Sequence, residues 1–243
     1  MEAHVKHSFL VAAVAIVFSS LAVTARAADM PVKAAPMAPA AIAYNWTGIY
    51  VGGLGGYGSA KGIHCALGFV CDPVTDPKGW SGGVTLGYNW QLANWVLGVE
   101  GDGSLAHMSA TAFSDPIFGC GGGANDGCVT KIKSYETVRA RLGWAFDRFL
   151  PYVTAGAAFT QLEASIGGAF PASGSTTRTS FAAGGGLEYA FWQNFSAKAE
   201  YLYISPLGNF QYDTIGACGA GCYVHVGAIN LVRFGVNWRF AGH

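Results

Sequence analysis

Nine charged side chains recur along five segments of the chain, each next to apolar residues or glycines. Four are acids and five are bases, so the set is close to neutral. Alternate residues of a β-strand share one face, and opposite charges that meet across a β-ladder pair, most strongly when arginine meets a carboxylate. The expected chemistry is mutual neutralisation, or the selection of ions. The residues are Glu100, Asp102, Arg139, Arg141, Glu188, Lys198, Glu200, Arg233 and Arg239.

The six cysteines form three close pairs in the sequence. In an exported chain, three local disulfides are the simplest connectivity. A metal site is the alternative, but no CxxC spacing occurs. The expected pairs are Cys65 with Cys71, Cys120 with Cys128, and Cys218 with Cys222.

Three histidines, His64, His107 and His225, lie in or near different predicted loops. They could converge on haem or a metal ion, because neutral imidazole is a common ligand, or they could be exposed loop residues. Ser109, Ser114 and Asp115 lie near His107 in sequence, which alone does not make a catalytic triad. We therefore expect no enzyme activity and no cofactor.

The elements that position these residues are β-strands. Within 231–240 apolar side chains occupy the even positions, and from Arg233 to Arg239 the odd positions hold Arg, Gly or Asn. This period of two is that of a strand with one apolar and one polar face. We predict eight strands: 47–58, 80–92, one from Trp95, one ending at Phe146, 151–162, 180–190, 195–204 and 231–240.

The N-terminus indicates export. Residues 1–27 combine basic residues, an apolar run and an Ala-Arg-Ala cleavage site, so we predict a signal peptide. Residues 28–45 are a Pro/Ala-rich periplasmic leader, and 46–240 form one domain. Only 12% of the residues are charged and 51% are apolar, which is typical of a membrane protein. After the signal no apolar run is long enough for a transmembrane helix, which leaves an antiparallel transmembrane β-barrel.

The connections orient this barrel. Short turns near Ala93-Asn94, Asp147-Arg148 and residues 192–194 belong on the periplasmic side, and long loops over 59–79, 106–131, 163–179 and 205–223 outside. Tryptophans beside the short turns predict an aromatic girdle at the inner rim. These are Trp46, Trp90, Trp95, Trp144, Trp192 and Trp238. Zero formal net charge gives no indication of a nucleic-acid partner.

The charged face must point into the lumen, because bases facing lipid would cost about 2 to 4 kcal/mol each. Glu100 and Asp102 can then meet Arg139 and Arg141, while Lys198 and Glu200 meet Glu188 and Arg233 or Arg239. Eight strands enclose little more than their own side chains, which favours an ion-pair plug over a selectivity filter. Outward-facing Glu136 and Asn230 mark the outer membrane boundary.

Four segments carry a resemblance to a known family: 45–53 (NWTGIYVGG), 98–102 (GVEGD), 137–143 (TVRARLG) and 232–240 (VRFGVNWRF). With them the chain resembles the alphaproteobacterial outer-membrane β-barrel proteins, which include outer-membrane immunogenic and haemin-binding surface proteins. It is also similar in architecture to the membrane domain of outer-membrane protein A. The resemblance implies an eight-stranded barrel surrounded by outer-membrane lipid and inserted by the barrel assembly machinery, which reads an aromatic last strand such as that with Trp238 and Phe240.

The function expected from these features is that of a surface barrel with a charge-plugged lumen, which contributes to envelope integrity and presents disulfide-braced loops. The alternative is a small porin-like diffusion channel or a haem-binding surface receptor. Residues 241–243 follow the aromatic residue that normally ends such chains.

Overall fold

A computed structural model describes residues 44–66, 71–113, 127–167, 171–213 and 221–240, which belong to one compact unit, Ile42–His243. The predicted signal peptide and nearly all of the leader lie outside these ranges. Within them, no helix has the length and apolar character needed to cross a membrane.

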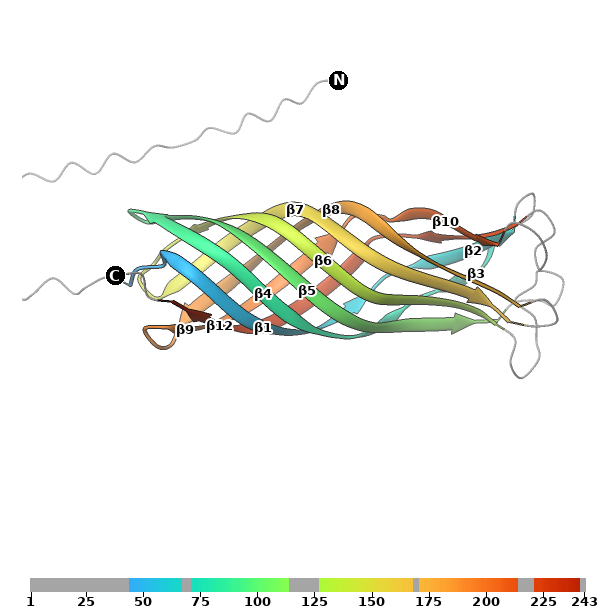
Figure 1. Ribbon diagram of the computed structural model, residues 1–243, viewed down its shortest axis with the longest axis horizontal. Coiled ribbons are helices and arrows are strands. Elements are labelled where there is room, and N and C mark those ends of the chain that lie inside the picture. Colours follow the sequence, from blue (N-terminus) through green and yellow to red (C-terminus); the bar gives the residue numbers. More distant parts are fainter. Residues whose placement is uncertain (1–43, 67–70, 114–126, 168–170, 214–220, 241–243) are drawn as a thin grey trace, which may run out of the picture. The chain divides into compact units, whose positions relative to one another are not determined.

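Eight antiparallel strands close into a barrel, as the sequence predicts, and each pairs with its neighbours in the order β1-β12-β9-β8-β7-β6-β5-β4. Figure 1 shows this barrel with its short turns at one end. The strands are β1 (Gly48–Ser59), β4 (Lys78–Leu92), β5 (Trp95–Ala112), β6 (Cys128–Trp144), β7 (Phe149–Ile166), β8 (Ala172–Ala190), β9 (Phe195–Ile204) and β12 (Ile229–Arg239).

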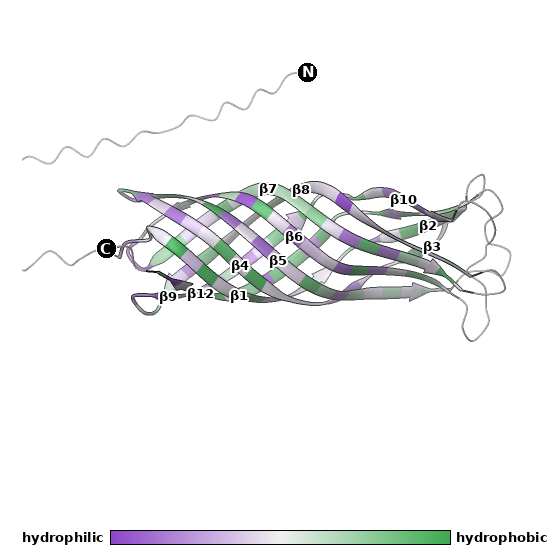
Figure 2. Cartoon of the chain, viewed as in Figure 1, coloured by the Kyte–Doolittle hydropathy of each residue, from purple (hydrophilic) through white to green (hydrophobic). Residues whose placement is uncertain are grey.

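Alternation along each strand sets which side chains face outward. Hydrophobic and hydrophilic residues follow one another along the strands in Figure 2. Near the middle of the barrel the outward residues are apolar, such as Val138 and Phe234, each 62% exposed, while their neighbours Arg139 and Arg233 are buried. The inward register of the charged face is therefore confirmed.

The short turns lie where the sequence predicts them. Ala93 and Asp147 adopt positive φ of 53° each, which suits the tight hairpin turns that connect twisted strands. Phe146 and Phe149 close the second turn through two backbone hydrogen bonds of 2.8 and 3.0 Å. These turns hold β4 to β5 and β6 to β7 in the register that the interior requires.

The predicted long loops are largely wrong, because β5 to β8 continue well beyond the predicted ends. Toward these ends of the strands the pattern inverts: Ile132 and Leu162 point inward, whereas Lys131 and Lys133 are exposed. A strand that leaves lipid for water needs an apolar inside and a polar outside, the reverse of its membrane part.

Two hairpins form a second sheet in the order β10-β11-β2-β3, one within the first predicted long loop and one that begins in the last. We call it the extracellular sheet, after the side on which the sequence predicts these connections. It consists of β2 (Gly62–Ala66), β3 (Cys71–Thr75), β10 (Gly208–Asp213) and β11 (Cys222–Val226). It lies at the end of the barrel opposite the short turns (Figure 1), where β10 contacts β8, and β3 contacts β5 and β6. It packs over the open side left by the extended strands.

Two apolar clusters fill the ends of the interior. The upper core joins inward residues of the extended strands to the extracellular sheet, for example Met108, Ile132, Leu162, Phe210 and Val224. The basal cluster lies beside the short turns. It consists of Trp46, Val96, Ala145, Leu150 and Ala190, with Tyr44 packed against them.

The aromatic girdle is confirmed except at Trp46. Four tryptophans are exposed beside the short turns or at the end of the last strand: Trp90, Trp95, Trp192 and Trp238. The Trp144 ring packs edge-on against the Trp95 ring, with 4.7 Å between the ring centroids. Trp46 is only 1% exposed, and its Nε1 donates to the Asp147 carbonyl at 2.9 Å. It closes the base of the lumen instead of facing lipid, because the segment before β1 turns inside.

Candidate functional site in the barrel lumen

Eight of the nine predicted charges meet in one buried network at the middle of the lumen. Four are acids and four are bases, so the network is neutral. They come from five strands, β5, β6, β8, β9 and β12. Its members are Glu100, Asp102, Glu188, Glu200, Arg139, Arg141, Lys198 and Arg233.

Arg139 is the centre of the network. The ladder places it opposite Glu100, and its Nη2 lies 2.7 Å from Glu100 Oε1 and 2.7 Å from Asp102 Oδ2. Its Nη1 reaches across the lumen to Glu200 Oε1 at 3.1 Å. On β7 the ladder partner of Arg139 is Gly156. A side chain at this position would clash, because an added Cβ would lie 2.0 Å from the Val138 carbonyl oxygen. A single guanidinium thus joins carboxylates from two sides of the barrel.

Two further bases complete this group. Arg233 donates from Nη1 to Asp102 Oδ1 at 2.7 Å and from Nε to Glu200 Oε1 at 3.1 Å. Lys198 donates to Glu100 Oε2 at 2.7 Å, although its ladder partner is Glu188. Each base is therefore fixed by the geometry of the whole lumen, not by its nearest strand alone.

Arg141 and Glu188 form a second group nearer the short turns. Arg141 Nη2 donates to Glu188 Oε2, and its guanidinium lies 3.8 Å from the centre of the Tyr152 ring. Ser196 and Asn237 donate to the other oxygen of Glu188, the latter at 2.9 Å. The carboxylate thus has partners on both oxygens, which burial requires.

Arg239 does not join the ion pairs, which corrects the prediction. It donates to the hydroxyl of Tyr44 and, at 3.1 Å, to the carbonyl of Gln193. Its guanidinium lies 4.3 Å from the centre of the Tyr44 ring and 5.4 Å from that of Trp46. Its position at the end of the last strand, next to Tyr44 and Trp46, brings it to aromatic rings instead of acids.

Three uncharged residues of the network escape prediction from the charges alone. Tyr50 donates to Glu100 Oε2 at 2.7 Å, Tyr152 donates to Glu200 Oε2 at 3.0 Å, and Thr137 donates to Asp102 Oδ2 at 2.6 Å. Thr137 shares the face of Arg139 and Arg141, a signal that could have found it. Tyr50 lies on β1, which has no charged residue, and Tyr152 lies on β7, whose one charged residue, Glu163, is near the far end of the strand. Their size favours an outward assignment.

The comparisons with known proteins agree with this architecture. Residues 14–240 match the family model described as outer membrane protein beta-barrel domain. The chain belongs to this outer-membrane β-barrel family. The 31 kDa outer-membrane immunogenic protein of Brucella melitensis is 31% identical over 250 residues, which cover 96% of this chain and 99% of that protein.

A further relative is the 22 kDa outer membrane protein of Rhizobium leguminosarum bv. viciae, 30% identical over 206 residues, which cover 85% of this chain and 82% of that protein. In fold, the chain is similar to the crystal structure of OprG from Pseudomonas aeruginosa, with a TM-score of 0.50 and 11% identity over 81% of this chain and 99% of that one. The outer-membrane location and the alphaproteobacterial resemblance are thereby confirmed.

The three histidines of this outer-membrane barrel do not converge. His107 and His225 are exposed on β5 and β11, and His225 Nδ1 pairs with Asn209 Oδ1 at 2.8 Å. His64 is buried, with Nε2 2.8 Å from Thr130 Oγ1 and Nδ1 3.1 Å from the hydroxyl of Tyr212. Among the described residues no group of three or more His, Cys, Asp or Glu could hold a metal ion.

The structure defines the oxidation state of the cysteines only in the part of the chain that it describes. No described cysteine is a free thiol, and Cys65, Cys128 and Cys222 are in disulfide form. Cys65 and Cys71 are ladder partners in β2 and β3. Cys120 and Cys218, like Ser114 and Asp115, lie outside the described residues, so the predicted pairing stays a prediction.

We predict that Arg139→Met lowers the free energy of unfolding by about 3 to 5 kcal/mol, since three buried carboxylates lose their shared partner. Adding Asp102→Asn should recover part of this loss by restoring neutrality. Lys131→Met is the control, because its exposed pair with Glu163 is worth about 0 to 1 kcal/mol. The measurement is denaturant unfolding of the refolded barrel in detergent, and equal losses in the single and double variants would contradict the account.

We predict that His64 makes the extracellular sheet sensitive to acid. Burial lowers the pKa of His64 from 6.5 to about 4, so the unfolded sheet binds more protons between these pH values. The sheet should be fully stable above about pH 6.5 and should lose stability as the pH falls toward 4. The measurement is amide hydrogen exchange of β2 and β10, corrected for intrinsic rates. Exchange should become faster below pH 6.5 in the natural protein and not in His64→Gln. The same pH response in both proteins would refute the prediction.

Proposed function

We propose that this outer-membrane barrel is a closed surface protein, which contributes to envelope integrity and conducts no solute. The observation that carries the proposal is the series of buried side-chain groups along its interior. The basal cluster, the ion-pair network and the upper core follow one another from the short turns to the extracellular sheet. A solute that passed through would have to displace all three.

The ion-pair network supports a plug more than a selectivity filter. A filter binds ions loosely enough to release them, and its charges must reach water. Here the carboxylates and bases are buried and already neutralise one another, and Tyr50, Tyr152 and Thr137 take further positions on the acids. An ion that entered the lumen would meet carboxylates and bases that are already paired with one another.

Two further parts of the expected function are included in the proposal. The relatives from Brucella are named outer-membrane immunogenic proteins, which supports a role of the extracellular sheet as a surface antigen in this chain too. Trp238 and Phe240 face outward at the end of the last strand, in reach of the barrel assembly machinery that is proposed to read them. Diverging histidines offer no support for a haem receptor.

Conductance tests the closed lumen. The mature chain, refolded in detergent and shown to be a barrel by its heat-dependent gel shift, should give no steady openings in planar bilayers. Arg139→Met with Asp102→Asn keeps the network neutral and should also stay closed, since the basal cluster and upper core remain. Steady openings of the natural protein that change with Arg141→Met would overturn the plug and favour a pore.

Envelope integrity is tested in the bacterium that encodes the chain. Deletion of the gene should increase sensitivity to detergent and to large antibiotics, because the outer membrane loses a protein that its lipids surround. The natural gene and the neutral double variant should both restore resistance. A deletion strain as resistant as its parent would contradict this part of the proposal.

A further inference from the structure

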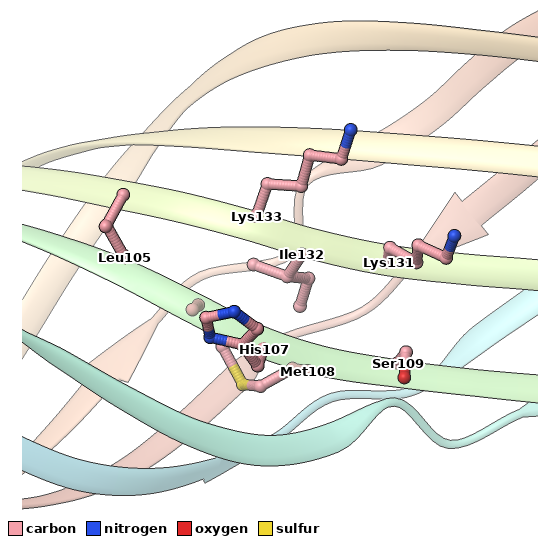
Figure 3. Close-up of a pocket in the computed structure, with 8 residues that line it drawn as sticks. Leu105, His107, Met108, Ser109, Lys131, Ile132 and Lys133 are labelled. Atoms are coloured by element: carbon pink, nitrogen blue, oxygen red, sulfur yellow. The ribbon is translucent and has the colours of Figure 1, made fainter.

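A groove of about 460 Å³ lies along β5 and β6, above the apolar part of the barrel wall. Figure 3 shows the side chains that line it. Leu105 lies at one end, 70% exposed, and His107, Ser109, Lys131 and Lys133 contribute polar groups farther along. Its walls are otherwise mostly apolar.

Irregular pairing builds this groove. The β5–β6 ladder shifts register between Leu105 and Met108, and the β6–β7 ladder shifts between Ile132 and Ser134. A bulge leaves backbone unpaired and re-aims the side chains around it. Two bulges on adjacent strands at the same height therefore produce a depression that a regular sheet would lack.

The groove has more positive charge than its neighbours neutralise. Lys131 Nζ lies 3.8 Å from one oxygen of Glu163, and Lys133 pairs with the other oxygen of the same carboxylate. One acid is thus shared by two ammonium groups, each of which has three donors. Lys78 adds a third base, because Ser109 is the ladder partner of both Lys78 and Lys131.

The groove also lies where the barrel wall changes from apolar to polar. On the outward face of β5, Leu97, Val99 and Leu105 are exposed apolar residues, and His107 and Ser109 follow them. In an outer-membrane barrel this change marks the height at which acyl chains give way to headgroups. A ligand here meets a basic rim and an apolar wall together.

We propose that this groove binds a phosphorylated glycolipid of the outer leaflet. Its phosphate lies against the ammonium groups of Lys131 and Lys133, with His107 beside them, and one acyl chain runs down the wall over Leu105. Lysine binds phosphate as a point charge, and basic pockets at membrane boundaries bind lipid headgroups by this chemistry. The inference concerns the outer wall and stands apart from the proposal for the lumen.

Native mass spectrometry of the full mature chain in detergent tests the site with bisphosphorylated lipid A as the probe. Each lysine near a charged lipid surface strengthens binding about fivefold, so Lys131→Gln with Lys133→Gln should weaken it about twenty-five-fold. Lipid A with the same acyl chains but no phosphate should bind the natural protein weakly and be indifferent to the two changes. Leu105→Ala should weaken both lipids.

Lys61→Gln is the matched control for Lys133→Gln, because Lys61 is an exposed base in the connection between β1 and β2 and does not line the groove. It should leave binding unchanged. The heat-dependent gel shift of each variant verifies its fold. The proposal is overturned if phosphate makes no difference, if Lys61→Gln weakens binding as much as Lys133→Gln, or if inorganic phosphate alone displaces the lipid.

Discussion

An eight-stranded barrel has room inside for little more than its own side chains, and every charge placed there must find an opposite charge. This constraint explains the arrangement of the lumen. Arg139 bridges acids from opposite walls, and Arg233 connects two of the same acids a second time. Because the bonds cross the lumen, they fix the strands around the whole ring relative to one another. The network thus ties together strands that are not neighbours in the barrel wall.

Most of the membrane part could be predicted from the sequence, because there the polar inside and the apolar outside alternate with the strand period. The limits of β9, 195–204, and the turn at Ala93 are as predicted. The extensions of β5 to β8 were missed since the pattern inverts in them: inward Ile132 and outward Lys131 continue the strand with exchanged chemistry. Strands of five or six residues in the extracellular sheet are too short for alternation to distinguish them from loops.

The candidate site was predictable as far as charge identifies it. Alternation places all nine charged residues on the buried face, but which acid meets which base depends on distances across the lumen, as the bond from Lys198 to Glu100 shows. The partners of Arg239 and the burial of Trp46 could not be predicted, because the segment before β1 enters the base of the barrel and no periodic pattern describes that turn. The inversion of polarity also explains why a basic groove can lie directly above an apolar wall at Leu105.

The most direct test of the arrangement is the accessibility of spin labels in the protein reconstituted into lipid bilayers. Labels at Val138 and Phe234, both on the outer wall, should collide freely with oxygen dissolved in the acyl chains, and a label at Ser104, which is buried in the lumen, should be shielded from it. Shielded labels at Val138 and Phe234, together with an oxygen-accessible label at Ser104, would contradict an account in which lipid surrounds the apolar face and paired charges fill the inside.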